Sequence, residues 1–100
     1  MKVTNITNGR GRKVPNQFII ENENVYTFQS YDSVIATVDF DNSTITLGSG
    51  WNYSTTTSRY RNAFFETLGL YEMSNTESVR KAINDGEIVG YTVVYEEGLK

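Results

Sequence analysis

The chain has 100 residues, of which 38% are hydrophobic and 13% aromatic, and its formal net charge is −3. A chain of this length and composition forms a single globular domain over residues 1–100 rather than a disordered segment. It contains no Cys and no His. Disulfides, thiolate chemistry, Ser-His and Cys-His catalysis and the common zinc sites are therefore excluded.

The first half of the chain has the pattern of several short strands. Residues 17–22, 24–31, 32–40 and 44–49 are rich in β-branched and aromatic residues, and the Asn and Asp residues between them favour turns. This pattern predicts an antiparallel meander. Alternation with a period of two places one set of apolar side chains on a common face: Phe18, Ile20, Tyr26, Phe28, Val34, Ala36 and Val38.

The second half changes to the helical period. Tyr60, Phe64 and Leu68 recur every four residues, hydroxyl side chains at 54–57 can cap the helix start, and Gly69 can end it. A capping box at 74–77 and a turn at 84–86 bound a second helix, and residues 87–97 follow as a final strand. We expect residues 1–7 to pair either with that strand or with the first strand of the meander.

Together these elements predict an α+β fold, an antiparallel β-meander sheet of four to six strands with two helices packed on one face. The N-terminal residues lack the apolar segment of a signal peptide, and no apolar run is long enough to cross a membrane. We therefore expect a soluble, cytoplasmic protein that makes no contact with a membrane.

The glycine-spaced loop in the stretch "ITNGRGRKVPNQF" contains the basic residues Arg10, Arg12 and Lys13. A Walker A loop needs a Ser or Thr after its Lys and a helix behind it, whereas this loop continues into Val-Pro and a strand. The loop is therefore not a nucleotide cradle. Three charges on an acidic protein also disfavour direct nucleic-acid binding, which requires several neutralised phosphates. A solvated hairpin turn and a contact with an acidic partner stay open.

Acidic and aromatic side chains in the middle of the chain are the candidate partner-binding residues. Residues 21–58 contain five acids and no base, and a sheet face carrying them could complement a cationic surface. Tyrosine and tryptophan at element junctions are the residue types that anchor protein interfaces. The predicted partner-binding residues are Glu21, Glu23, Tyr31, Asp32, Asp39, Asp41, Trp51 and Tyr53.

No pattern in the sequence indicates a catalytic centre, a cofactor or a metal. Asp39, Asp41 and Asn42 have a spacing that calcium loops use, but the Gly and the distal Glu of an EF-hand are missing. We expect no cofactor and no metal, and an enzyme is the least favoured class of function.

The pieces "NQFII", "FQSYDS" and the helix entry "W-x-Y-S-x-T-T", within residues 14–65, carry a family resemblance. This part of the chain resembles a small uncharacterised domain encoded by phages and mobile elements of Gram-positive bacteria. The resemblance brings no catalytic residues and implies an accessory protein of the anti-CRISPR type. Such a protein would bind and inhibit a host defence protein, for example a Cas nuclease, by occluding its nucleic-acid-binding surface.

Two alternatives stay open beside the inhibitor. A nucleic-acid-binding accessory protein would use Arg10, Arg12 and Lys13 together with Arg59 and Arg61. A structural or assembly component would form a homo-oligomer through an open edge of the sheet. The acidity of the chain and the resemblance favour the inhibitor.

Overall fold

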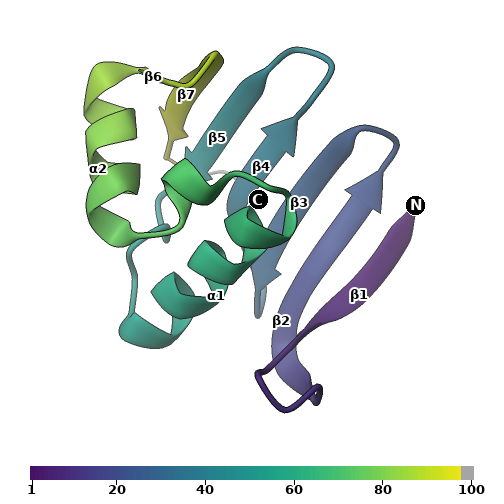
Figure 1. Ribbon diagram of the computed structural model, residues 1–100. Coiled ribbons are helices and arrows are strands. Elements are labelled where there is room, and N and C mark those ends of the chain that lie inside the picture. Colours follow the sequence, from purple (N-terminus) through teal and green to yellow (C-terminus); the bar gives the residue numbers. More distant parts are fainter. Residues whose placement is uncertain (98–100) are drawn as a thin grey trace.

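The computed structural model describes residues 1–97, which form a seven-stranded sheet with helices on one face (Figure 1). The strands of the meander are β1 (Lys2–Thr7), β2 (Lys13–Asn22), β3 (Val25–Ser30), β4 (Ser33–Asp39) and β5 (Thr44–Gly48). They are followed by α1 (Thr55–Thr67), the short 3-10 helix η1 (Tyr71–Met73), α2 (Thr76–Asp85), β6 (Glu87–Ile88) and β7 (Tyr91–Glu96).

The strand order of the sheet is β1-β2-β3-β4-β5-β7-β6. β1 pairs with β2, which settles the two predicted partners of the N-terminal strand in favour of the meander. β7 lies beside β5 and runs parallel to it, because α1 and α2 carry the chain back along the sheet before β7 begins. The predicted α+β class is confirmed. Over the described residues the sheet has seven strands instead of four to six, and one of its pairs is parallel.

The core fills the layer between the helices and the face of the sheet that they cover (Figure 1). Phe28 of β3 stacks on Phe64 of α1 with ring centroids 5.9 Å apart, and Phe64 contacts Phe65 at 5.3 Å. Ile45 and Leu47 of β5 are fully buried in the same layer. This packing fixes α1 over the middle of the sheet and places its N-terminus near the β3–β4 turn.

Both α-helices begin at side-chain caps. Ser54 Oγ accepts a hydrogen bond from the Thr57 backbone N–H at 3.1 Å, which confirms the cap predicted for α1. At α2 the cap is Asn75, whose Oδ1 accepts from the Ser78 N–H at 2.8 Å. The capping box predicted to start at Ser74 is therefore wrong by one residue, because the Asn side chain caps the helix instead.

The face predicted for the apolar residues of β2 is wrong. Ile19 pairs with Phe28 and packs against the core, so Phe18 and Ile20 lie on the opposite, uncovered face of the sheet. Three consecutive apolar residues give no alternation from which the buried face could be chosen. The register instead follows the pairing with β3.

A bulge in β4 also moves Val34 off the predicted face. Phe28 pairs with Ala36 and the next residue, Gln29, pairs with Val34, so Ile35 is an extra residue in β4. Ile35 is itself buried. Because of this extra residue, Val34 lies on the same face of the sheet as Gln29, opposite to the face that the helices cover.

The turn between β6 and β7 contains a strained residue, Val89, which has φ of 43° and a side chain that is 70% exposed. The left-handed conformation costs an L-residue such as valine about 1–2 kcal/mol, and Asn before Gly is favoured in a turn of this kind. Val89→Asn is expected to raise the free energy of unfolding by about 1 kcal/mol, measured by chemical denaturation. The matched change Val94→Asn, at an exposed valine within β7, is expected to lower it. Equal changes in the free energy of unfolding for the two variants would contradict the assignment of backbone strain to Val89.

Candidate functional site

A groove of about 860 Å³ opens at the end of the sheet where β3 turns into β4. The turn forms one side, and the segment from the end of β5 to the first turn of α1 forms the other. Six serine and threonine side chains line it: Ser30, Ser33, Ser49, Ser54, Thr56 and Thr57. Tyr31, Asp32 and Tyr53, three of the predicted partner-binding residues, also line this groove. The structure therefore brings together residues from two separate sequence segments.

The two tyrosines of the groove are open to solvent. The side chain of Tyr53 is 84% exposed and that of Tyr31 is 63% exposed. Tyr31 has φ of 54°, an uncommon conformation for a non-glycine residue. Two hydrogen bonds hold its backbone there, from the Tyr31 N–H to Asn16 O and from Gln29 Nε2 to Tyr31 O, both at 2.7 Å. A strained residue that is fixed by its neighbours and directs an aromatic ring outward is typical of a functional site.

Gln17 of β2 is the most deeply buried of the polar residues that line the groove. Its side chain is only 2% exposed, and its Oε1 is buried without a hydrogen-bond partner among the described residues. An unpaired buried acceptor destabilises a fold by about 1–3 kcal/mol. The sequence did not single out Gln17, because a polar residue near a strand start is usually exposed. Its pairing with Ser30 places it on the covered face of the sheet.

The predicted acidic face is not formed, because the five carboxylates are spread over the sheet. Asp32 lies in the β3–β4 turn at the groove. Glu23 and Asp41 lie at the opposite end, in neighbouring turns that a hydrogen bond of 2.9 Å joins. Glu21 faces the helix side of the sheet and Asp39 the other side, as the strand register shows. Only Asp32 accompanies the tyrosines.

Asp39 is held by Asn42 in the turn between β4 and β5. The Asn42 side-chain amide donates to Oδ2 at 2.8 Å and its backbone N–H donates to Oδ1 at 3.1 Å. These hydrogen bonds stabilise the carboxylate and lower the pKa of Asp39 below its ordinary value of 3.8.

This lowered pKa predicts a contribution to acid sensitivity. As the pH falls through 3.8 the unfolded chain takes up the proton before the native chain does, so the stability that Asp39 provides is lost. In Asp39→Asn the free energy of unfolding is expected to fall less steeply between about pH 4 and pH 2 than in the wild type. Asn42→Ala, which removes the amide donor, is expected to reduce the slope in the same direction. Denaturant titrations at several pH values measure both, and unchanged slopes would contradict the assignment.

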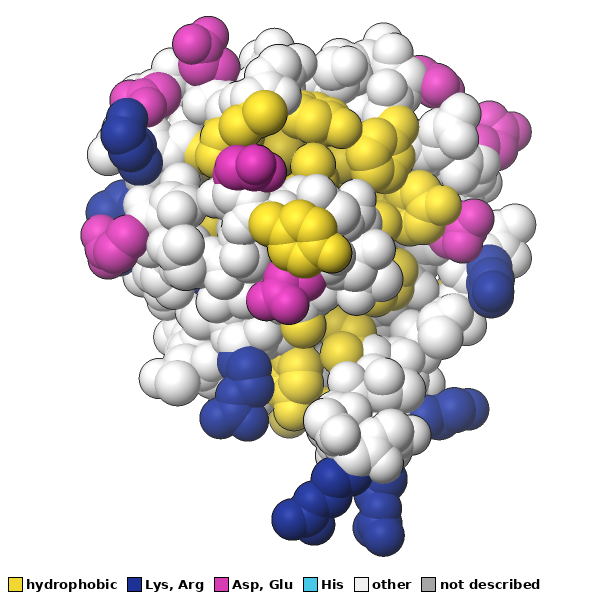
Figure 2. All heavy atoms as spheres, viewed as in Figure 1, with side chains coloured by type: hydrophobic (Ala, Val, Ile, Leu, Met, Phe, Trp, Pro, Cys, Tyr) yellow, Lys and Arg dark blue, Asp and Glu magenta, His cyan; other side chains and the backbone are white. Residues whose placement is uncertain are grey.

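The predicted basic residues Arg10, Arg12 and Lys13 lie at the β1–β2 hairpin and are exposed. Asn8 closes the turn, because its Oδ1 accepts from the backbone N–H groups of Arg10 at 2.9 Å and Arg12 at 3.1 Å. Figure 2 shows basic side chains projecting at the lower end of the molecule, where Figure 1 places this hairpin. The loop is thus an ordered hairpin, and the meander places it at the same end of the sheet as the groove.

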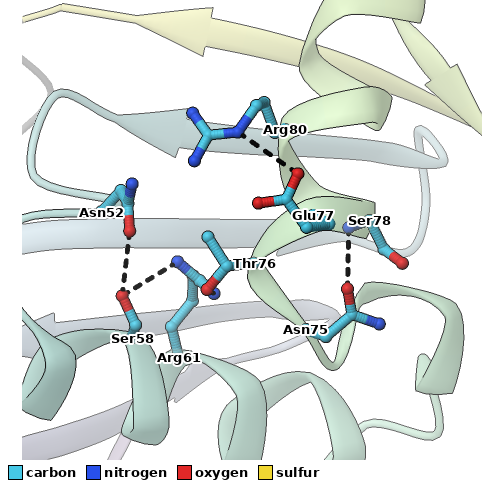
Figure 3. Close-up of polar contacts among 8 residues, drawn as sticks. All are labelled: Asn52, Ser58, Arg61, Asn75, Thr76, Glu77, Ser78 and Arg80. Atoms are coloured by element: carbon cyan, nitrogen blue, oxygen red, sulfur yellow. Dashed lines mark hydrogen bonds and ion pairs between the residues drawn. The ribbon is translucent and has the colours of Figure 1, made fainter.

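Arg61 cannot contact nucleic acid from the surface, because its side chain is buried. Its predicted role beside Arg59 in nucleic-acid binding is therefore wrong. Its side chain is fully buried, and within residues 1–97 no carboxylate forms an ion pair with it. Its guanidinium donates to Trp51 O at 2.6 Å, Asn62 Oδ1 at 2.7 Å and Thr76 Oγ1 at 2.9 Å. Figure 3 shows Arg61 between α1 and the start of α2, so it links the two helices to the loop before α1.

Trp51 is half-buried, and its ring packs against two guanidinium groups. Those of Arg61 and Arg80 lie 5.5 Å and 5.4 Å from the ring centroid. Burial, and after it the nearby charge of Arg80, lowers the pKa of Arg61 to about 10. Trp51 thus neighbours the groove segment in sequence but packs into this arginine cluster and is not among the residues that line the groove.

The described residues contain no group of three or more acidic, His or Cys side chains able to hold a metal ion. In the same part of the chain, neither α-helix has the length and apolar character needed to cross a membrane.

The geometry defines a two-layer α+β fold with a tyrosine-flanked groove, lined by serine and threonine, at one end of its sheet. The model of a family of unknown function, DUF8033, matches residues 1–86, and the chain belongs to this family. The match extends beyond the predicted 14–65 and includes the groove and both α-helices, while β6 and β7 lie after it. No curated protein and no solved structure matched the chain.

Proposed function

We propose that this protein is a phage or mobile-element accessory protein that binds a host defence protein, for example a Cas nuclease, and covers its nucleic-acid-binding surface. The observation that carries the proposal is the groove flanked by Tyr31 and Tyr53. Its combination of tyrosine, serine and glycine is the composition that antibody paratopes use. Tyrosine gives a large contact area at low entropic cost, and serine gives adaptable hydrogen bonds.

The fold presents this surface in a fixed form. The Tyr31 backbone is held by hydrogen bonds from both β2 and β3, and Ser54 caps α1 on the facing side. A surface that is ordered before binding loses less conformational entropy in the complex. The groove therefore supports recognition of a partner without folding upon binding.

Charge supports a cationic partner. The net charge of −3 and Asp32 at the groove would complement the Arg- and Lys-rich surface with which a nuclease holds nucleic acid. Such an interaction is expected to weaken as salt increases, because exposed charges are screened. Occlusion of that surface would inhibit the partner without any reaction.

The proposal is tested by capture followed by a functional assay. Immobilised wild-type protein is incubated with nuclease-treated lysate of a Gram-positive host, and the partner that is retained is identified and purified. The expected result is that adding wild-type protein displaces labelled DNA or RNA from the partner, measured by fluorescence anisotropy, and that about 0.5 M salt weakens the complex. A partner that binds nucleic acid equally well with and without the protein would contradict the proposal.

The exposed basic hairpin supports nucleic-acid binding as a second candidate. In that case the protein alone would bind labelled DNA or RNA at about 0.1 M salt. Neutralising Arg10, Arg12 and Lys13 together would abolish this binding. Because Arg61 is buried, fewer of the predicted arginine and lysine residues are available to contact nucleic acid.

A further inference from the structure

We infer that the groove is an acceptor site for a guanidinium group, so that the partner inserts an arginine side chain between Tyr31 and Tyr53. This inference rests on the proposed function, because it names the chemistry of the partner group that enters the same groove. It is carried by three properties of the groove: an unpaired buried acceptor, one carboxylate and two exposed aromatic rings.

The unpaired acceptor is Gln17 Oε1. This amide lies in the groove wall, and its oxygen has no donor among the described residues. Oε1 itself is closed to solvent, so a ligand reaches it once the amide turns toward the groove, and a hydrogen bond donated there would remove the cost of an unsatisfied buried group. The hydroxyl side chains that line the groove offer further acceptors, so the groove suits a ligand with several donors.

The charge of the groove is negative. Asp32 is the single ionisable carboxylate among the described lining residues, and no Lys or Arg lines the groove. A cation is therefore favoured over an anion, and an isolated carboxylate beside hydroxyls provides a charge-assisted partner.

The tyrosine rings distinguish guanidinium from ammonium. Guanidinium is planar, stacks on aromatic faces and presents five N–H donors in a fixed fork, whereas lysine is a strongly hydrated point charge. A groove flanked by Tyr31 and Tyr53, with acceptors along its wall, matches the flat donor-rich group. An arginine of a nucleic-acid-binding surface has this chemistry.

The inference is tested by titrating isotope-labelled protein with N-acetyl-arginine amide, N-acetyl-citrulline amide and N-acetyl-lysine amide, followed by NMR. Citrulline has nearly the shape of arginine but no charge. The arginine compound is expected to cause saturable shifts at Tyr31, Gly50 and the Gln17 amide, and to bind about tenfold or more tightly than citrulline. Equal affinity for citrulline or lysine, or no saturable shift, would overturn the assignment.

Two variants link the shifts to the groove. Asp32→Asn is expected to weaken arginine binding about tenfold, whereas the matched change Asp41→Asn, at the far end of the sheet, is expected to leave it unchanged. Gln17→Leu is expected to weaken arginine binding while raising the melting temperature, because it removes an unpaired buried acceptor. These effects have opposite signs, so loss of binding cannot be attributed to unfolding. Unchanged arginine binding in both variants would overturn the inference.

The same variants separate this inference from the proposed function. If the captured partner is displaced from nucleic acid equally well by wild type and by Asp32→Asn, the inhibitor proposal stands and the guanidinium site is wrong. If arginine binds as expected but no partner loses nucleic acid, the site stands and the inhibitor proposal is wrong.

Discussion

Replacing Arg61 by alanine is expected to lower the free energy of unfolding by about 2–5 kcal/mol, an amount that would unfold much of a marginally stable domain. The guanidinium is fully buried and links Trp51 O, Asn62 and Thr76. Its removal would leave the Trp51 carbonyl without this donor, open a cavity between α1 and α2, and remove one of the two cations over the Trp51 ring. Chemical denaturation followed by far-UV circular dichroism measures the loss.

Arg59→Ala is the matched control, because Arg59 belongs to the same helix but its side chain is exposed. A change within about 0.5 kcal/mol is expected there. Arg61→Lys should also destabilise strongly, since lysine keeps the charge but cannot reach Trp51, Asn62 and Thr76 in one plane. If Arg61→Ala were as mild as Arg59→Ala, the buried network would have no structural role.

The double variant Tyr31→Asn, Tyr53→Ser is expected to weaken partner binding by roughly a thousandfold. A central interface tyrosine contributes about 2 kcal/mol or more, and each 1.4 kcal/mol is a factor of ten in affinity. Asparagine tolerates the left-handed conformation that Tyr31 adopts at φ of 54°. The melting temperature is therefore expected to stay the same or to rise. Affinity for the purified partner is measured by titration calorimetry.

The control for this variant is Tyr71→Ser in η1, which removes an equally exposed tyrosine outside the groove. It is expected to change the affinity by less than about threefold. Similar losses in Tyr71→Ser and in the groove variant would indicate a different binding face, and no loss in either would contradict the proposed role of the groove.

Much of the fold could be predicted from local patterns. A helix cap within residues 54–57 follows from hydroxyl side chains ahead of a four-residue apolar repeat, and the structure confirms it with Ser54 as the cap. The strands of the meander follow from turn residues between β-branched runs. Such features depend on a few neighbouring residues, so the sequence alone determines them.

The features that could not be predicted depend on pairing between distant residues. The buried face of β2 is chosen by its register with β3, because the run Phe18-Ile19-Ile20 fits either face. Gln17 becomes a groove residue through the same register, and the sequence gives no signal for it. Arg61 lies at an ordinary helical position, and it is buried by the packing of α2 and of the loop that contains Trp51.

The residues of the candidate site were predicted in part, because their positions in space also depend on the pairing of the strands. Tyr31 and Tyr53 were predicted to bind a partner because they are tyrosines at element junctions, and Asp32 because it is one of the five acids; the structure brings these three to one groove. Glu21, Glu23, Asp39 and Asp41 were grouped by their nearness in sequence. A meander, however, sends successive turns to opposite ends of the sheet, so these acids are separated from the groove. Their role in partner binding stays a prediction.

The parallel pairing of β7 with β5 has a consequence for the order in which the chain folds. Each strand of the meander pairs with a strand that follows it after a short turn. β5 pairs on its other side with β7, where Thr44 lies opposite Thr92, so this pairing forms only after both helices and β7 have been synthesised. Contacts between distant residues form slowly, and an unpaired strand edge attracts other chains in the meantime. Among the strand edges that the finished sheet covers, that of β5 therefore stays unpaired longest during translation. Variants that delay the docking of α1 and α2 are expected to aggregate on the ribosome or soon after release, even where the finished domain is stable.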